Sequence, residues 1–442
     1  MTPIQPAMAA ELALRQRAEQ VRADLCSQDA AWGSRGWTRR SFITATGLVG
    51  VAALGSQLVT SRGAYAAVPS TSQNTLITIF LRGAADGLRI LAPSSSLLGL
   101  DFLNTVRGPL VLGDAQLVPL PGALGWGVHK ALRPLVDGLW STGELAFVPA
   151  VAATGLSRSH FDAQQMLEKG GSTRYTTGWL DRVLQQLGPG TTFRALGEGY
   201  GSPASFAGNQ PKLVINSLKD FAFPGWDEIR PASQAAVSGL YRGMTGPLGE
   251  DVPTTVAALA TVATVRAGAG VQNSADYPAG DFSDALKDLA DVLRAEVGLQ
   301  VATVDVGGWD THANEVEDLD VLLTSAANSL AAFMTDLGPA RRARVTVVVM
   351  TEFGRRVPMN DSGGADHGHG GLVWLLGGGI VGGVHGTWLP LTAATLDDGD
   401  VPGVNNMFDV LGEVVQKRLG VGTLSTVFPN HAVSPLGVAK VG

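Results

Sequence analysis

Histidine and carboxylate side chains gather in three short segments of the 442-residue sequence. The segments are Ser159–Asp162 (SHFD), Asp310–His312 (DTH) and Asp366–His369 (DHGH), and together they hold four of the seven histidines. Imidazole nitrogens and carboxylate oxygens are ligands that zinc and manganese take in proteins. A single histidine of this kind is most often an ordinary loop residue, but three clusters favour a common site. The sequence therefore predicts a divalent metal centre, with zinc, manganese, magnesium or calcium as the ion.

Two further acidic residues lie just beyond apolar segments that are typical of strands. Asp86 follows residues 75–81 after a short turn rich in Gly and Ala, and Glu352 directly follows residues 345–351. The carboxyl ends of parallel strands meet at one edge of a sheet, so these acids and the histidine clusters should lie close together. So many carboxylates in one place repel one another unless a cation or protons are bound. Of the two histidines in the last cluster, one could serve only to orient a ligand. The predicted metal ligands are Asp86, Asp310, His312, Glu352, Asp366, His367 and His369.

Three other histidines and one enzyme-like motif do not indicate a functional site. His129, His385 and His431 have no adjacent acidic residue, and we expect them to be structural. Residues Gly377–Gly382 match G-x-G-x-x-G, but the segment that follows looks extended rather than helical. We therefore expect a turn there and no dinucleotide site, which needs the amino terminus of a helix. The sequence has no G-x-S-x-G elbow, which argues against an ordinary α/β-hydrolase triad.

The elements that must position these residues alternate between apolar strand patterns and amphipathic helix patterns. This alternation predicts a three-layer α/β fold with a mainly parallel sheet and helices on both faces. Two segments rich in Gly, Pro and Ala, 188–211 and 240–280, are interpreted as surface insertions rather than domain boundaries. The predicted strands are 75–81, 145–150, 212–216, 299–306, 345–351 and 372–376, and the predicted helices are 130–142, 160–169, 178–187, 281–297, 316–337 and 406–419.

The amino-terminal region has the pattern of an export signal. Residues Thr38–Ile43 (TRRSFI) form a twin-arginine motif, followed by a mildly apolar stretch and the small-x-small signal Ala64–Ala66. The sequence predicts a twin-arginine signal peptide over residues 1–66, with a retained membrane anchor as the alternative. The expected partner is the twin-arginine translocase, and the expected location is the periplasm or the extracellular space. Cys26, the single cysteine, lies in this leader, so the mature chain would have neither a disulfide nor a thiolate ligand.

Composition excludes other classes of protein. Apolar types make up 45% of the residues and charged types 16%, so the chain can bury a large core. The formal net charge of −7 is the wrong sign for non-specific nucleic-acid binding. Beyond the amino-terminal region there is no strongly apolar run of membrane-spanning length, so no stable transmembrane domain is expected.

Five motifs occur in an order that resembles a known family. Together they are similar to the bacterial, twin-arginine-exported family called domain of unknown function 1501, from about Thr75 to the carboxyl terminus. That family in turn resembles the alkaline phosphatase and sulfatase superfamily. The motifs are 81–87 (LRGAADG), 159–164 (SHFDAQ), 307–312 (GGWDTH), 351–355 (TEFGR) and 366–370 (DHGHG).

The resemblance implies one alkaline-phosphatase-like domain over residues 67–442, with assigned roles for motif residues. Asp86 corresponds to the metal-binding Asp after the first strand, and Asp310 and His312 to a ligand pair, here more tightly spaced. His367 corresponds to a late His ligand, and Glu352 stands where the superfamily usually has an Asp followed by His.

The nucleophile implied by the resemblance is Ser159, with Ser157 as the second choice, and His160 belongs to the same catalytic turn. Two departures limit the comparison. Phe353 occupies the position of an expected His ligand, so the second metal is in question. The mature chain has no Cys for conversion to formylglycine, which excludes a Cys-type sulfatase.

Two functions of different classes follow from these observations. The first is an exported, metal-dependent hydrolase of phosphate or sulfate esters, acting on a small-molecule or polymer ester, in which Arg82, Arg158 and Arg355 could clamp the oxygens of the anion. The alternative is a non-catalytic exported binding protein that keeps the fold with a reduced metal site. The absence of a His at Phe353 favours the alternative.

Overall fold

The computed structural model describes residues 59–60, 73–153, 157–199, 201–223, 230–241, 244–245 and 247–442. The predicted leader, with its twin-arginine motif, Cys26 and the cleavage signal, lies outside the described residues except for Val59–Thr60. The chain divides into two compact units, one of residues 59–220 and 262–442, the other of residues 1–58 and 221–261. The sheet and all predicted site residues belong to the first of these, the larger unit.

The larger unit is built on a ten-stranded sheet in which β8, β7, β9, β2 and β10 run parallel to one another. β11 is antiparallel to both of its neighbours, β10 and β6, and β1 is antiparallel to β8. β12 and β13 each add to β6 in parallel. The strands, in sheet order, are β1 (Val59–Thr60), β8 (Lys212–Ile215), β7 (Ala195–Glu198), β9 (Val301–Val306), β2 (Thr75–Leu81), β10 (Val345–Met350), β11 (Gly371–Leu376), β6 (Leu145–Ala152) and β12 (Gly383–Val384), with β13 (Asn405–Asn406) also on β6.

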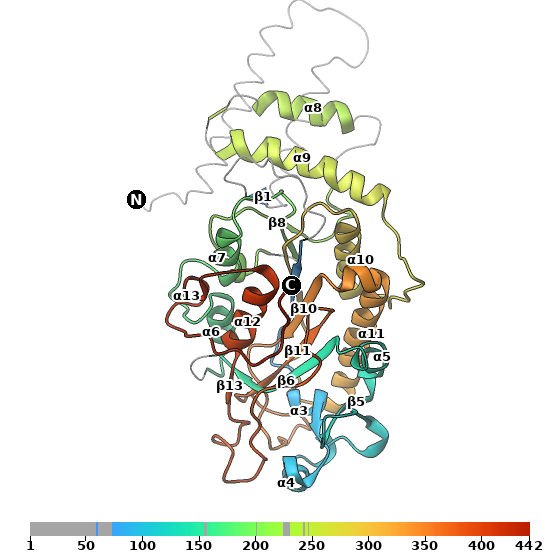
Figure 1. Cartoon of the computed structure of the whole chain (residues 1–442), viewed down its shortest axis with the longest axis vertical. Coiled ribbons are helices and arrows are strands. Elements are labelled where there is room, and N and C mark those ends of the chain that lie inside the picture. Colours follow the sequence, from blue (N-terminus) through green and yellow to red (C-terminus); the bar gives the residue numbers. More distant parts are fainter. Residues whose placement is uncertain are drawn as a thin grey trace, which may run out of the picture. The chain divides into compact units, whose positions relative to one another are not determined.

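Helices cover both faces of this sheet, as Figure 1 shows, with α10 and α11 on one side and α6, α7, α12 and α13 on the other. The central strands are buried along their whole length, which explains why their sequences are continuously apolar. Alternate residues of β2 serve the two layers, and Leu76 and Phe80 pack in the core that includes α7 and α12. The covering helices are α6 (His160–Glu168), α7 (Trp179–Gln186), α10 (Asp281–Arg294), α11 (Glu315–Arg342), α12 (Met407–Leu419) and α13 (Leu424–Val427).

The remaining elements of the larger unit are short. A second, three-stranded sheet has the order β3, β5, β4, and the segment 130–140 is helical but changes from 3-10 to α to π geometry along its length. Their bounds are α3 (Gly87–Ile90), β3 (Leu91–Pro93), α4 (Leu100–Val106), β4 (Leu117–Pro119), β5 (Trp126–His129) and α5 (Arg133–Leu135). In the other unit the described residues form α8 (Arg230–Tyr241) and the first part of α9 (Pro247–Ala267).

The three-layer α/β prediction is confirmed, and most elements lie where the sequence placed them. The first predicted strand has the observed bounds of β2, and the helix predicted to end at residue 337 stops being regular at Gly338, whose φ is 66°. The G-x-G-x-x-G segment leads into β12 and not into a helix, as expected.

Two interpretations of the sequence were wrong. Residues 188–211 are not only a surface insertion, because they contain β7, which is buried and lies between β8 and β9. β7 is only four residues long and includes a glycine, so its sequence does not show the alternating or continuously apolar pattern by which a strand is recognised. The segment 240–280 is likewise no simple insertion, because it contains the whole of the long helix α9 and the point at which one compact unit gives way to the other.

Sheet order brings the predicted site loops to one edge. β9, β2 and β10 are adjacent and parallel, so the loops that follow them, which carry Asp310, Arg82–Asp86 and Glu352, leave the sheet side by side. β11 runs in the opposite direction, so the loop before it, with His367, reaches the same edge. In β6, Ala150 is an extra residue opposite β11 with a φ of 53°, a bulge that bends the strand shortly before the Ser157–His160 turn.

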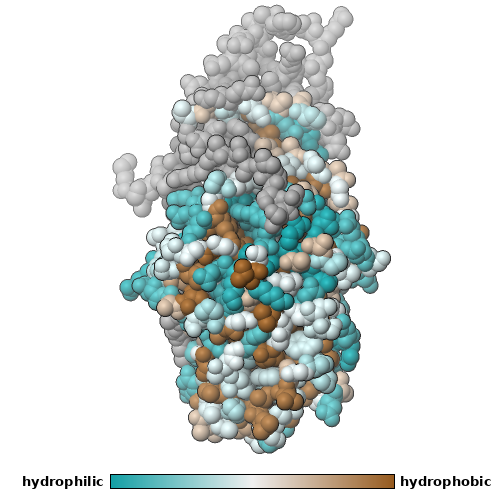
Figure 2. Space-filling model, in the orientation of Figure 1, coloured by the Kyte–Doolittle hydropathy of each residue, from teal (hydrophilic) through white to brown (hydrophobic). Residues whose placement is uncertain are grey.

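None of the described helices is long and apolar enough to span a membrane. On the face seen in Figure 2, hydrophobic side chains form small groups among hydrophilic ones. Such scattered exposure is ordinary for a folded protein surface.

Candidate metal centre

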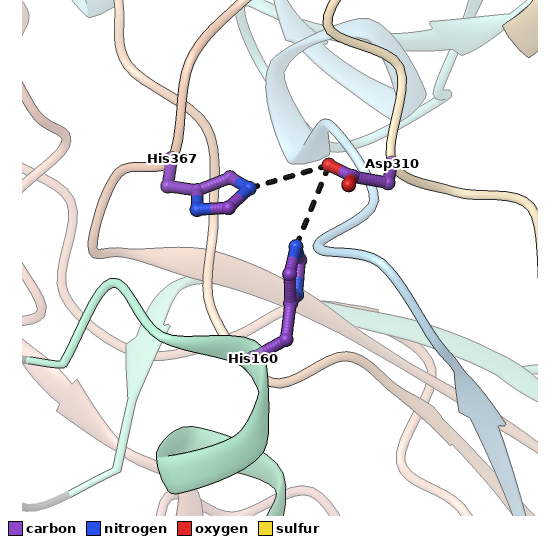
Figure 3. Close-up of side chains that lie close together, drawn as sticks. All are labelled: His160, Asp310 and His367. Atoms are coloured by element: carbon purple, nitrogen blue, oxygen red, sulfur yellow. Dashed lines mark hydrogen bonds and ion pairs between the residues drawn. The ribbon is translucent and has the colours of Figure 1, made fainter.

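Three imidazole rings converge on one carboxylate oxygen at the carboxyl edge of the sheet. Asp310 Oδ1 lies 3.0 Å from His312 Nε2, 3.2 Å from His367 Nε2 and 3.4 Å from His160 Nε2. The Nε2 atoms of His312 and His367 are 2.8 Å apart. Figure 3 shows His160, at the first turn of α6, and His367 both pointing toward the same oxygen of Asp310.

The other nitrogen of each ring faces an oxygen that can only accept a hydrogen bond. His160 Nδ1 lies 2.7 Å from Glu352 Oε1, His312 Nδ1 lies 3.2 Å from Asp366 Oδ1, and His367 Nδ1 lies 2.8 Å from the backbone carbonyl of Arg158. Ionised carboxylates and carbonyls have no proton to give, so each Nδ1 is the donor in its contact. In a neutral ring, Nε2 then carries a lone pair that points inward, toward Asp310.

Four acceptor atoms that face one another repel unless something positive lies between them. The separations of 3.0 to 3.4 Å from Asp310 Oδ1 are short enough for atoms that bind one ion through bonds of about 2.0 Å. His160 Nε2 is also buried, with no hydrogen-bond partner among the described residues. His160, His367 and Asp310 can thus each offer one ligand atom to a common divalent cation, and His312 lies against two of them.

Local electrostatics sets the protonation of Asp310, Asp366 and His367. Burial alone would raise the pKa of Asp310, but the adjacent Arg355 guanidinium and the neighbouring imidazoles outweigh it and lower the pKa to about 2. Burial lowers the pKa of His367, which keeps its ring neutral. A hydrogen bond from Asn360 lowers the pKa of Asp366, with a further contribution from His312. At neutral pH the cluster therefore has ionised carboxylates and a neutral His367 ring.

Arg355 holds the loops that carry the cluster. Its guanidinium is 0% exposed and donates from Nε to the carbonyl of Ala84 (2.7 Å), from Nη1 to that of Ala365 (2.9 Å) and from Nη2 to that of Gly83 (2.6 Å). Nη2 also lies 2.6 Å from Asp310 Oδ1. A side chain with all these bonds inside the protein cannot reach a substrate, which corrects the expectation that Arg355 clamps an anion.

The close approach of these loops also requires a glycine. Gly83 has a φ of 122°, in the region that only glycine adopts readily, and a Cβ there would lie 2.4 Å from the backbone nitrogen of Asp310. The turn after β2 therefore lies directly against the loop after β9.

The other two arginines proposed as clamps are engaged by acidic side chains. Arg82 pairs with Glu168 at 3.0 Å and with Asp305 at 2.8 Å. Arg158 pairs with the buried Asp400 at 2.8 Å and with Asp398 at 3.3 Å. Their charges are largely neutralised by these partners.

The structure brings together some of the predicted ligands and separates others. Asp310, His312 and His367 form the centre, Asp366 contacts His312, and Glu352 contacts His160. The place of His160 among the converging rings was missed, because its sequence context pointed to the serines beside it. The sequence did contain a signal for it, because His160 lies two residues before the acidic Asp162 in one of the three histidine and carboxylate clusters.

Asp86 and His369 lie apart from this centre, contrary to expectation. Asp86 caps α3 by accepting from the backbone N–H of Leu88 and forms a buried ion pair with Arg107. Burial and the charge of Asp86 raise the pKa of the adjacent Glu315 to about 9, so only one of these two carboxyls is ionised at neutral pH. His369 Nδ1 lies 3.5 Å from Asp397 Oδ2. Among the contacts of the described residues, none joins Asp86 or His369 to Asp310 Oδ1 or to the Nε2 atoms of the converging imidazoles.

The serine turn adjoins the centre. Ser159 caps α6, where its Oγ accepts from the backbone N–H of Asp162, and Ser157 Oγ accepts from the N–H of Ser159. The same turn supplies the His160 ring and the Arg158 carbonyl that holds His367. Ser157 and Ser159 therefore flank the carbonyl that holds His367 and precede His160 on the same turn.

Comparison with known proteins gives one family and distant structural likenesses. A family model described as "Protein of unknown function (DUF1501)" matches residues 150–406. No curated protein matches the sequence. Among solved structures, the lipoteichoic acid synthase LtaP from Listeria monocytogenes is 11% identical, with 88% of this chain and 79% of that chain covered and a TM-score of 0.34. Alkaline phosphatase from the Antarctic bacterium TAB5 is 8% identical, with 70% and 92% covered and a TM-score of 0.25.

Replacing Arg355 should be far more costly than replacing its neighbour Arg356. Arg355→Met leaves buried carbonyls of three loops without a donor, so we expect the free energy of unfolding to fall by about 3 kcal/mol or more. Arg356→Met removes a partly exposed contact to Asp400 at 3.7 Å and a hydrogen bond to the backbone carbonyl of Asp398, and should cost about 1 kcal/mol or less. Urea unfolding followed by tryptophan fluorescence measures both. Equal losses in the two variants would contradict the role assigned to Arg355.

Proposed function

The chain belongs to the DUF1501 family of proteins of unknown function, and we propose that it is an exported, metal-dependent hydrolase of phosphate or sulfate esters. The observation that carries the proposal is the convergence of three imidazole Nε2 atoms on Asp310 Oδ1. A protein gains nothing for its stability from lone pairs that repel, so the arrangement is best explained by a ligand that binds there.

The metal would be held by His160, His312, His367 and Asp310. Three nitrogen donors and one oxygen favour zinc or manganese over magnesium and calcium, which prefer sites made of oxygen. When bound, such an ion supplies Lewis-acid polarisation of an ester oxygen and favours the deprotonated form of a neighbouring hydroxyl.

The chain itself would supply the nucleophile. Ser159 is the first candidate because it stands at the amino terminus of α6, where the partial positive charge of the helix stabilises a developing alkoxide. Its Oγ would form a bond to phosphorus or sulfur as the bond to the alcohol breaks, and water would then hydrolyse the seryl ester. Ser157, whose Oγ accepts from the N–H of Ser159, is the second candidate.

A second candidate function is non-catalytic binding at the same centre. It is favoured by the engagement of Arg82 and Arg158 with acidic side chains and the burial of Arg355, which leave these residues unsuited to neutralise an anionic ester. It is also favoured by Phe353, which packs against the rings of His160 and His367 in place of a further ligand. The protein would then keep one cation for binding a partner or polymer.

We also propose that the protein is exported by the twin-arginine translocase and acts in the periplasm or extracellular space. The support is the twin-arginine motif, the mildly apolar stretch and the small-x-small signal at Ala64–Ala66. Folding before export would allow the centre to be loaded inside the cell.

Removing one converging ligand should release the metal. His160→Ala and Asp310→Ala are each expected to weaken Zn²⁺ or Mn²⁺ binding by more than about 100-fold, beyond the effect of losing an outer partner. The control is His369→Ala, which removes a nearby imidazole that does not contact the centre and should bind as the wild type does. Elemental analysis and competition with a chelating dye measure the content and affinity.

The same measurement has an expected pH dependence. Metal binding needs neutral rings, and an imidazole takes up a proton below a pKa of about 6.5. Affinity should therefore fall as the pH is lowered from about 8 to 5. Equal metal loss in His369→Ala and His160→Ala would contradict the proposed ligand set.

Catalysis is tested with aryl phosphate monoesters, phosphate diesters and sulfate esters, offered to the Zn²⁺- or Mn²⁺-loaded protein. We expect turnover of at least one class, loss of turnover in Ser159→Ala with metal content unchanged, and retention in Ser157→Ala. Turnover lost only in Ser157→Ala would transfer the role to the second serine. A loaded wild type that hydrolyses none of these esters supports the binding function instead.

Export is tested by changing the twin arginines. Arg39→Lys together with Arg40→Lys keeps the charge but removes the guanidinium pair that the motif requires. The variant should stay in the cytoplasm with its leader attached, while the wild type appears outside, cut near Ala66. Cell fractionation and the mass of the protein report both, and normal export of the variant would exclude this route.

A further inference from the structure

Helix α6 presents a second polar side chain one turn beyond His160. Gln164 is four residues further along, so the two side chains lie on the same face of the helix. Both contact the same atom of the loop after β10: Glu352 Oε1 is 2.7 Å from His160 Nδ1 and 2.8 Å from Gln164 Nε2. We propose that Gln164 is a positioning residue that fixes the His160 ring through Glu352. This inference rests on the metal centre of the proposed function.

The orientation of the Gln164 amide follows from its other neighbour. Arg82 Nη1 lies 3.2 Å from Gln164 Oε1, and a guanidinium can only donate. The amide oxygen must therefore face Arg82, which leaves the NH₂ group as the donor to Glu352. Arg82 is itself held by Glu168 and Asp305 and lies over the ring of Phe80, 4.1 Å from its centre.

Glu352 is held tightly enough to transmit this orientation. Its side chain is 0% exposed, and Oε1 also accepts from the backbone N–H of Gly83 at 2.9 Å. Oε2 accepts from the hydroxyl of Thr351 at 3.0 Å. Each bond removes one way in which the carboxylate could turn, so its position relative to His160 is fixed from several sides.

The consequence for His160 is the choice of tautomer. While Glu352 accepts from Nδ1, the lone pair of Nε2 points at Asp310, where a cation would lie. If Glu352 turned away, the ring proton could move to Nε2 and occupy that position. Gln164 suits the task because its amide gives one donor to Glu352 and one acceptor to Arg82, which neither leucine nor glutamate can do.

The test compares Gln164→Leu and Gln164→Glu with Gln165→Leu, a matched change at the exposed neighbouring position. Two properties are measured: Zn²⁺ affinity by competition with a chelating dye, and the ring tautomers in the metal-free protein by ¹⁵N NMR of labelled histidine. Loss of one signal in His160→Gln identifies the resonances of His160. Thermal unfolding shows whether each variant is folded.

Gln164→Leu is expected to weaken Zn²⁺ binding about 10-fold and to give a mixture of His160 tautomers, whereas the wild type has the proton on Nδ1. Gln164→Glu keeps the length of the side chain and the contact to Arg82 but opposes Glu352 with a second negative charge, so its loss of affinity should be larger. Gln165→Leu should match the wild type in both measurements. If Gln164→Leu does not fold, Gln164→Glu carries the test, since it changes the donor and not the packing.

The outcomes separate this inference from the proposed function. A wild type that binds no Zn²⁺ refutes the metal centre, while the tautomer measurement on the metal-free protein still decides the role of Gln164. Unchanged affinity and an unchanged His160 tautomer in both Gln164 variants overturn the inference and leave the metal centre standing.

Discussion

The buried guanidinium of Arg355 is the interaction on which the rest of the centre depends. It gives its protons to carbonyls from the turn after β2, the loop after β9 and the loop before β11, and to the carboxylate of Asp310. A charge taken out of water is costly unless every proton finds an acceptor, so the loops must take up one arrangement to satisfy it. The position of Asp310, and hence the point on which the imidazoles converge, is set by that requirement.

The imidazoles are then oriented from outside. Each Nδ1 is tied to an acceptor, Glu352, Asp366 or the Arg158 carbonyl, so each Nε2 turns inward. The unfavourable approach of the lone pairs is offset by these outer bonds and by Arg355. If a cation binds there as proposed, its ligands would need little rearrangement, which is the usual effect of such outer partners.

Much of this could be predicted from the sequence, for physical reasons. Long buried strands such as Val345–Met350 are continuously apolar, and the sheet edge to which they lead gathers the residues that follow them. That reasoning placed Asp310, His312 and His367 together. The same reasoning could not predict that Asp86 pairs with Arg107, because the spacing of residues along the chain does not indicate which ion pairs form on folding. It also could not predict whether Arg355 is buried and binds backbone carbonyls or is exposed and binds a substrate, since an arginine can do either. β7 was too short to be recognised.

The converging residues are far apart in the sequence, and this has a consequence for how the chain folds. His160 and His367 meet only after β2, β9 and β10 have paired and β11 has been added beside them. Contacts between such distant segments close long loops, which costs entropy and makes them late events in folding. The four-atom arrangement can therefore exist only in a chain whose central sheet is complete. Occupancy of this centre would therefore report that the central sheet of the larger unit is complete.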